Sequence, residues 1–480
     1  MITREDFATI VPVLIVVLAG CAALVAEAIR RKGDRMPAGI FGIIGLSGAA
    51  YTSIMQWGQH RTGFGVILAD DFALFINLLL CAIGLLTILL SWGTAERDHL
   101  PEGEYHSLLL FSLAGMMLMG STRDLLVIFI ALEIMSLGVY VLTGIKRASA
   151  EGAEAAFKYF VLGAFSSAFF LYGIALAYAA TGSTKLDDIG QAVAASISQP
   201  DLLLVMAMLL LLVGFAFKVS AVPFHMWTPD AYQGAPTLVT AFMSTGVKAA
   251  AFAAFLRVFL SAFEPMRGDW IPILSIVAGL TMIIGTVVGV AQSNVKRMLA
   301  YSSIAHAGYL LVGLVAASDA GKASVLFYLA AYAVTNLGAF GVIAALSSND
   351  RPHDEIRDFA GLWHERPGMA GLLTVFLLSL GGFPPTVGFI GKWYIINAAV
   401  QQGRIYLAIL AVLTSVVSVF FYLRVVVMMY MTDDKAPGDR PRTPWMVAAG
   451  LGLALVVVFY LGVQPGQIIT FARKSVEAIF

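Results

Sequence analysis

About fourteen apolar runs of some twenty residues follow one another along the sequence and leave little else. A helix of about 20 apolar residues is long enough to cross the hydrocarbon core of a bilayer. The longest polar stretch, 347–367, is about twenty residues long, too short for an independent core. With 59% hydrophobic and 12% charged residues, the chain is expected to be an all-α polytopic membrane protein with about 14 transmembrane helices.

One apolar region, residues 211–248, is interrupted in an unusual way. Lys218 precedes Pro223, and the next apolar run carries Lys248 in its middle. A proline lacks an N–H and leaves the carbonyl four residues earlier without its helical donor. Broken helix and buried lysine are both tolerated at membrane depth only inside protein or beside a watery cavity. We therefore expect an ion path through the bilayer with Lys218 on it.

A second apolar run has a similar interruption five runs later. Four residues break the helix there, Gly381, Gly382, Pro384 and Pro385, and Lys392 follows shortly after them. Paired discontinuous helices at corresponding positions of two halves indicate an inverted-repeat transporter. We expect three helices in 1–104, two five-helix inverted repeats in 105–263 and 264–431, each with one discontinuous helix, and a last helix with its tail in 432–480.

Three further ionisable residues lie inside apolar runs. Glu133 sits about 12 Å into its run, so it either stays protonated or faces a buried cation; we favour the cation. Lys158, in the first turn of its run, either snorkels to the interface or faces the path. Lys248 lies about 18 Å into its run, too deep for snorkelling, which predicts a functional role.

A polar stripe marks the run that begins after Lys296. Ser302, Ser303, His306 and Tyr309 fall mostly on one helical face. A lone histidine on an apolar face is usually a packing residue. This stripe instead favours a proton relay, because imidazole both donates and accepts.

Charges near the ends of the runs suggest an orientation. Arg257 and Arg424 lie late in their runs and are expected to be interfacial anchors. With the N-terminus outside, the inward loops, such as residues 30–35, hold more lysine and arginine than the outward ones. The positive-inside rule then places both termini outside.

Three longer segments carry a resemblance to a known family. They read KVSAVPFHMWTPDAYQGAPTLVTAF, VKRMLAYSSIAHAGY and GGFPPTVGFIGKWY. They resemble the antiporter-like proton-translocating subunits of NADH:quinone oxidoreductase, respiratory complex I. Within that family, a length near 480, fourteen spans, His306 and Lys392 are most similar to subunit N.

The resemblance implies both a function and a site. The function is to couple NADH-to-quinone electron transfer to proton pumping. In the first half-channel, Glu133 and Lys218 form a pair with Lys158 beside it. Lys248 is the central relay, His306 continues the polar axis, and Lys392 faces the exit half-channel.

The resemblance also implies the surroundings of the chain. It predicts neither cofactor nor metal in this chain, and places NADH, FMN, iron–sulfur clusters and quinone in other subunits. Cys21 and Cys81 lie in separate runs and form no cluster. The expected partners are the antiporter-like subunit M, the small subunits K and J and the lipid bilayer, with no nucleic acid. The expected location is the bacterial inner membrane.

Other functions fit part of the same pattern. A subunit of a multi-subunit sodium/proton antiporter or a membrane-bound hydrogenase would share the fold and the buried lysines, and genomic neighbours would discriminate. A scaffold for an adjacent transporter would explain Glu133 paired with Lys218, but not the unpaired Lys248 and Lys392.

Overall fold

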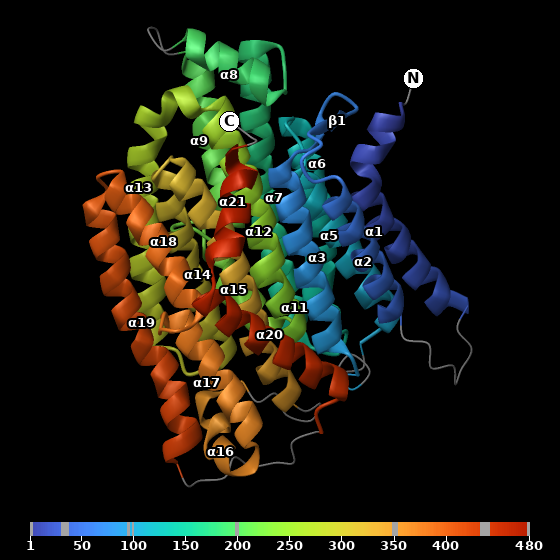
Figure 1. Ribbon diagram of the computed structural model, residues 1–480, viewed down its shortest axis with the longest axis vertical. Coiled ribbons are helices and arrows are strands. Elements are labelled where there is room, and N and C mark those ends of the chain that lie inside the picture. The colour runs from blue at the N-terminus through green and yellow to red at the C-terminus, as the bar shows by residue number, and fades with distance from the viewer. Residues whose placement is uncertain are drawn as a thin grey trace.

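The computed structural model describes residues 3–29, 38–93, 97, 100–196, 201–347, 354–432 and 442–477. It is a bundle of helices that run mostly along one axis, with the first helix beginning and the last ending toward the same end (Figure 1). Some basic residues of the expected inward loops lie outside the described residues, namely Arg30, Arg31, Lys32, Arg35, Arg351, Lys435 and Arg440.

The chain can be followed in four parts. The first contains α1 (Arg4–Ile29), α2 (Gly39–Met55), strands β1 (Arg61–Gly63) and β2 (Ile67–Ala69), which pair antiparallel, and α3 (Asp71–Ser91). The second contains α5 (Glu102–Gly120), α6 (Leu125–Thr143), α7 (Ala150–Thr181), α8 (Leu186–Ala195), α9 (Leu202–Lys218), α10 (Trp227–Gly234), α11 (Thr237–Phe242), η1 (Met243–Val247), α12 (Lys248–Arg257) and η2 (Val258–Ala262). The third contains η3 (Glu264–Met266), α13 (Arg267–Val290), α14 (Val295–Val315), α15 (Asp319–Leu346), η4 (Ile356–Phe359), α16 (Leu362–Glu365), α17 (Pro367–Gly381), α18 (Val387–Gln401) and α19 (Ile405–Met431). The last contains α20 (Trp445–Val463) and α21 (Gly466–Glu477).

The helices confirm the expected membrane fold. Within the described part, ten are long and apolar enough to cross a bilayer. The passes made by α2, by α5 and by the interrupted pairs α9–α10 and α17–α18 bring the number to about the fourteen expected. Short polar side chains fix several helix starts by accepting from the first free N–H groups. These N-caps are Asp70, Asp124, Ser149, Asp201, Asn294 and Ser318.

The first interruption satisfies its backbone inside the protein. α9 ends at Lys218, and Ser220 has a left-handed φ of 63°. The indole of Trp227 donates to the Phe217 carbonyl at 3.1 Å, so this carbonyl is bound without lipid or water. The residues from Lys218 to Val222 are buried, as membrane depth requires of irregular backbone.

The second interruption uses a glycine cap. α17 ends at Gly381, and Gly382 has a φ of +87°, a left-handed conformation that glycine adopts without a Cβ clash. The Gly382 N–H donates to the Leu378 carbonyl at 2.9 Å, which closes the last turn. The sequence therefore located both breaks correctly.

The interior of the bundle is formed by three passes. The first pass is Thr237–Ala262, which comprises α11 to η2, and all of its most apolar 18-residue stretch is buried. The buried share of the corresponding stretch is 94% in α14 and 89% in α15, but only 33% in α7. Polar groups on the three inner passes are therefore shielded from lipid by protein. Ser303, His306 and Tyr309 of the predicted stripe lie on α14 and are buried.

The structure places the two arginines expected as interfacial anchors differently. Arg257 is fully buried and pairs with Asp70, so the expectation of an interfacial anchor is wrong for it. Arg424 is half-buried and donates to the carbonyls of Val290 and Gln292 at the end of α13. A cation there complements the negative end of the helix dipole.

Candidate functional site

Lys218 is held by hydroxyl groups at the first helix break. Its side chain is 2% exposed, and Nζ donates to Ser136 Oγ at 2.8 Å and to Tyr140 Oη at 3.2 Å. Both partners lie on α6, one turn apart on the same face. The lysine therefore closes the end of α9 against α6 through groups that can both donate and accept a proton.

The expected ion pair between Glu133 and Lys218 is not formed. Glu133 is half-buried and accepts a hydrogen bond from Ser167 of α7 at 2.5 Å. The lysine partners Ser136 and Tyr140 stand three and seven residues further along α6, about 4.5 and 10.5 Å along its axis. Lys218 thus contacts the same helix through its hydroxyl groups and not through the carboxylate.

Lys158 lies at an opening and not beside Lys218. Its ammonium contacts Glu154 at 2.7 Å and Asp230 at 3.0 Å, and its side chain is 43% exposed. Arg297 also binds Asp230, at 2.7 Å. Lys158 is the ninth residue of α7, where its long side chain reaches Asp230 of α10.

A polar recess surrounds this charge cluster. It has a volume of about 200 Å³. Its lining mixes both signs of charge and consists of Glu151, Glu154, Ala155, Lys158, Asp230, Gln233, Gly234 and Arg297. Its floor includes α10, and the neighbouring Lys296 donates to the carbonyl of Ala235, just beyond the end of α10, at 2.7 Å. The recess brings charged side chains up to the second half of the interrupted helix.

Aromatic rings connect the recess side of the break to Lys218. Tyr140 meets Tyr159 edge to face with centroids 4.6 Å apart, and Tyr159 stacks on Trp227 at 4.2 Å. The Tyr140 hydroxyl fits over Gly163 of α7, where an added Cβ would lie 1.9 Å from it. Glycine is needed there for close approach of the two helices.

We expect Gly163→Ala to impair the Lys218 site. The new methyl group must displace Tyr140, because Cβ would also lie 2.7 Å from its ring carbon Cζ. Overpacking of this kind costs about 1–3 kcal/mol of stability. Proton transport, normalised to the amount of assembled subunit, should fall.

Two variants separate packing from hydrogen bonding. Tyr140→Phe should lower transport as well, because it removes one lysine partner without adding volume. Gly268→Ala should have no effect, since a Cβ there meets no heavy atom within 4 Å. Normal transport by assembled Gly163→Ala would show that the tyrosine contact is dispensable.

Lys248 lies at the centre of the bundle with uncharged partners. It is 1% exposed and near the middle of the 26-residue pass Thr237–Ala262. Its ammonium donates to the carbonyl and hydroxyl oxygens of Ser303, which also accepts from Tyr332 Oη at 2.8 Å. Among the residues that the structure describes, its hydrogen-bond partners are thus neutral, unlike those of a structural salt bridge.

His306 continues the polar groups from Ser303 along α14. Its Nδ1 shares a hydrogen bond with Tyr328 Oη at 2.6 Å, and Nε2 one with Tyr422 Oη at 3.3 Å. Tyr422 is also hydrogen-bonded to Ser302. Because imidazole and hydroxyl groups donate and accept, this cluster has the chemistry of a proton relay.

Lys392 binds the open end of the second interrupted helix. Nζ donates to the carbonyls of Leu380 and Gly381 at 2.9 and 3.0 Å and to Ser415 Oγ at 2.8 Å. These carbonyls end α17, where the helix dipole favours a cation. The ammonium also lies 5.2 Å from the ring centre of Tyr309 on the polar stripe.

The hydroxyl partners are the residues that sequence reasoning missed. The polar side chains that contact the buried lysines and the histidine are Ser136, Tyr140, Tyr328, Tyr332, Ser415 and Tyr422. Ser136 and Tyr140 could have been found from their helical spacing to Glu133. The others lie on helices other than that of the residue they contact, 22 to 116 positions away in sequence, and carry no local signal.

No metal centre is formed by the described residues. Within those ranges, no three His, Cys, Asp or Glu side chains are grouped as metal ligands.

Comparisons with known proteins show the family of the chain. Residues 122–418 match the sequence model of the NADH:quinone oxidoreductase/Mrp antiporter transmembrane family. NADH-quinone oxidoreductase subunit N of Trichlorobacter lovleyi is 43% identical over 475 residues, covering 98% of this chain and 97% of that protein. Subunit N 2 of Rhizobium meliloti is 43% identical over 468 residues, covering 97% and 96%.

Solved structures show the same fold. A chain of respiratory complex I from Thermus thermophilus superposes with a TM-score of 0.80 at 35% identity, covering 96% of this chain and 98% of that one. A chain of the Mrp complex from a Dietzia species has a TM-score of 0.87 at 21% identity, covering 99% and 97%. The second likeness concerns the fold alone. The chain therefore belongs to the NADH:quinone oxidoreductase/Mrp antiporter transmembrane family and within it resembles subunit N.

Proposed function

We propose that this protein is a proton-translocating membrane-arm subunit of NADH:quinone oxidoreductase, coupling electron transfer from NADH to quinone to proton pumping. The observation that carries the proposal is that the buried lysines Lys218, Lys248 and Lys392 are bound by neutral groups within one bundle. Desolvation disfavours a charged lysine that lacks a carboxylate. Lysines in such surroundings can take up and release protons.

In this proposal, protons enter at the recess of Lys158 and Asp230, a polar recess lined in part by α10, the second half of the first interrupted helix. Lys218, buried at the break, takes up the proton next, and Lys248 receives it at the centre. His306 and its tyrosine partners conduct it along α14, and Lys392 releases it on the far side.

Glu133 has a conditional role in the same scheme. At an effective dielectric constant of about 20, a charge pair at about 4 Å is worth about 4 kcal/mol. Contact of Glu133 with Lys218 would favour the charged lysine, and separation would favour release. The hydroxyl-bound Lys218 of this structure corresponds to the separated state. A shift between α6 and α9 would then load and unload one proton.

The same proposal sets the surroundings of the chain. The halves 105–263 and 264–431 act as two inverted repeats, after the helices of 1–104 and before the pass and tail of 432–480. The neighbours are subunits M, K and J in a bacterial inner membrane, and both termini face outside. NADH, FMN, iron–sulfur clusters and quinone are bound by other subunits of the enzyme.

Purification from native membranes tests the function. The chain, isolated with its partners in mild detergent, should carry with it flavin and iron–sulfur subunits, and the preparation should oxidise NADH with quinone. An unrelated membrane protein with the same tag provides the control. If the preparation lacked flavin and did not oxidise NADH, but showed sodium/proton exchange or hydrogenase activity, the chain would be a subunit of a sodium/proton antiporter or a membrane-bound hydrogenase instead.

A further inference from the structure

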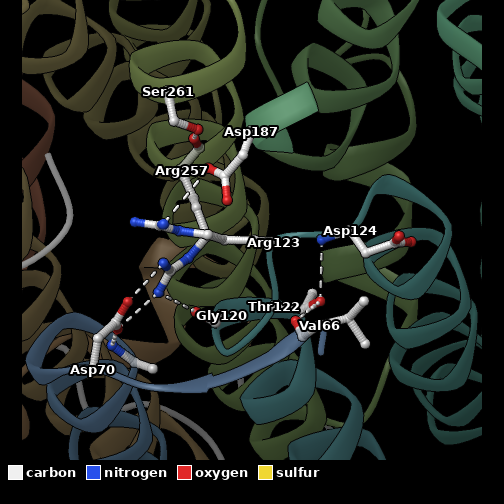
Figure 2. A network of polar contacts seen from close by, with 10 residues as sticks. Val66, Asp70, Gly120, Thr122, Arg123, Asp124, Asp187, Arg257 and Ser261 are labelled. Carbon is white, nitrogen blue, oxygen red and sulfur yellow. Dashed lines mark hydrogen bonds and ion pairs between the residues drawn. The ribbon is translucent and has the colours of Figure 1, made fainter. Parts of the chain in front are cut away.

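The helix segment that carries Lys248 ends in a buried ion pair far from the lysine. Arg257 NH1 and NH2 donate to the two carboxylate oxygens of Asp70 at 2.8 and 3.0 Å, and NH2 donates to the Gly120 carbonyl at 3.1 Å. Figure 2 shows the guanidinium directed at Asp70 with a further contact to Gly120. The Phe72 ring centre lies 4.9 Å from it. Three helix ends, those of α3, α5 and α12, therefore meet at one charge.

The burial of this pair makes its geometry selective. Arg257 is 0% exposed and Asp70 6%. Asp70 is also the N-cap of α3 and accepts from the Ala73 N–H at 2.8 Å. A bidentate arginine–carboxylate pair is satisfied in one planar orientation. A buried guanidinium without its partner is strongly unfavourable, so α12 cannot rotate freely away from α3.

The segment α12 is flanked at both ends by π-helical turns. η1 (Met243–Val247) precedes Lys248, and η2 (Val258–Ala262) follows Arg257, and both are π-helical. π-helical turns insert into α-helices mostly as single turns, frequently at functional sites. The rotation of α12 about its axis is therefore set by its side-chain contacts as well as by the backbone on either side.

Lys248 and Arg257 hold opposite faces of α12. Nine residues separate them, about two and a half helical turns, which places the side chains roughly 180° apart. Lys248 contacts Ser303 on α14, whereas Arg257 contacts Asp70 and Gly120 on the other side. A rotation that withdraws Lys248 from Ser303 must also displace Arg257 from Asp70.

We propose that the Asp70–Arg257 pair is a positioning pair that fixes the rotation of α12 and thereby holds Lys248 against Ser303. This inference rests on the proposed proton-translocating function. Among the described residues, the pair contacts Ala73, Gly120 and Phe72, which are not part of the proton path. It acts on proton transfer through the helix that it orients.

The test measures protons translocated per NADH oxidised in membranes with the assembled complex. Asp70→Asn should lower this ratio about threefold or more, and Asp70→Glu should restore much of it, because it retains a bidentate partner. The matched control is Arg267→Gln. Arg267 lies ten positions after Arg257 and forms an exposed pair with Glu264, which the substitution breaks. The ratio of this variant should equal that of the wild type.

A double variant covers the case in which Asp70→Asn does not assemble. Replacing a buried ion pair by apolar residues of similar size is often neutral for stability, so Asp70→Leu with Arg257→Met should assemble and show the same reduced ratio. A wild-type ratio in either assembled variant would overturn the proposal. Failure of both to assemble would overturn it too, by showing that the pair serves folding. An equal loss in Arg267→Gln would overturn its specificity.

A parallel Lys248→Ala variant separates the two levels of argument. Wild-type pumping in that variant would remove the relay role of Lys248, whatever the pair does. Loss of pumping in Lys248→Ala together with a normal ratio in Asp70→Asn would refute the positioning pair alone.

Discussion

Membranes with assembled Lys248→Ala complex should show NADH-driven proton uptake reduced by about two orders of magnitude, the scale of a lost acid–base group. The reason is the position of the lysine at the centre of a fully buried pass, with Ser303 as its hydrogen-bond partner. Alanine can neither hold nor pass a proton. Because no ion pair of Lys248 is broken among the described residues, removal should not leave a buried charge without its partner.

Two comparisons make that result specific. Lys185→Ala removes an exposed lysine and should leave proton uptake unchanged. Lys248→Arg keeps a charge that arginine does not release at physiological pH, and should be as impaired as alanine. Wild-type uptake by the assembled alanine variant would mean that protons cross by another route.

Local patterns predicted the fold well because membrane insertion constrains each helix separately. Pro223 and the pair Gly381 and Gly382 located both interrupted helices, and the structure places the breaks there. The stripe of Ser303 and His306 was correctly assigned to one buried helix. In lipid, backbone groups must be satisfied within helices, so sequence spacing alone determines much of the outcome.

Contacts between distant helices could not be predicted in the same way. Arg257 resembled an interfacial anchor because its partner Asp70 lies 187 residues earlier. Glu133 and Lys218 were expected to touch, yet the lysine contacts Ser136 and Tyr140, further along α6. Such differences of one or two helical turns depend on how helices slide against each other, which a single sequence does not specify.

Lys392→Arg should assemble normally and still transport protons poorly. Arginine can donate to the carbonyls of Leu380 and Gly381 and complement the end of α17, so the capping function is retained. It cannot release its proton at physiological pH, so transfer at this position should stop. We expect a loss of about tenfold or more in proton transport, measured against the amount of assembled subunit.

A second substitution at the same position distinguishes capping from proton exchange. Lys392→Met removes both functions. It leaves the Leu380 carbonyl without its lysine donor, at a cost of about 1–3 kcal/mol for a buried unsatisfied group, whereas the Gly381 carbonyl keeps a hydrogen bond from Ser415. Lys392→Met should therefore lower the amount of assembled complex as well as transport, whereas Lys392→Arg lowers transport alone. If Lys392→Arg pumped like the wild type while Lys392→Met did not, fixed charge at the break would be what Lys392 supplies, and proton release would have to occur at another residue.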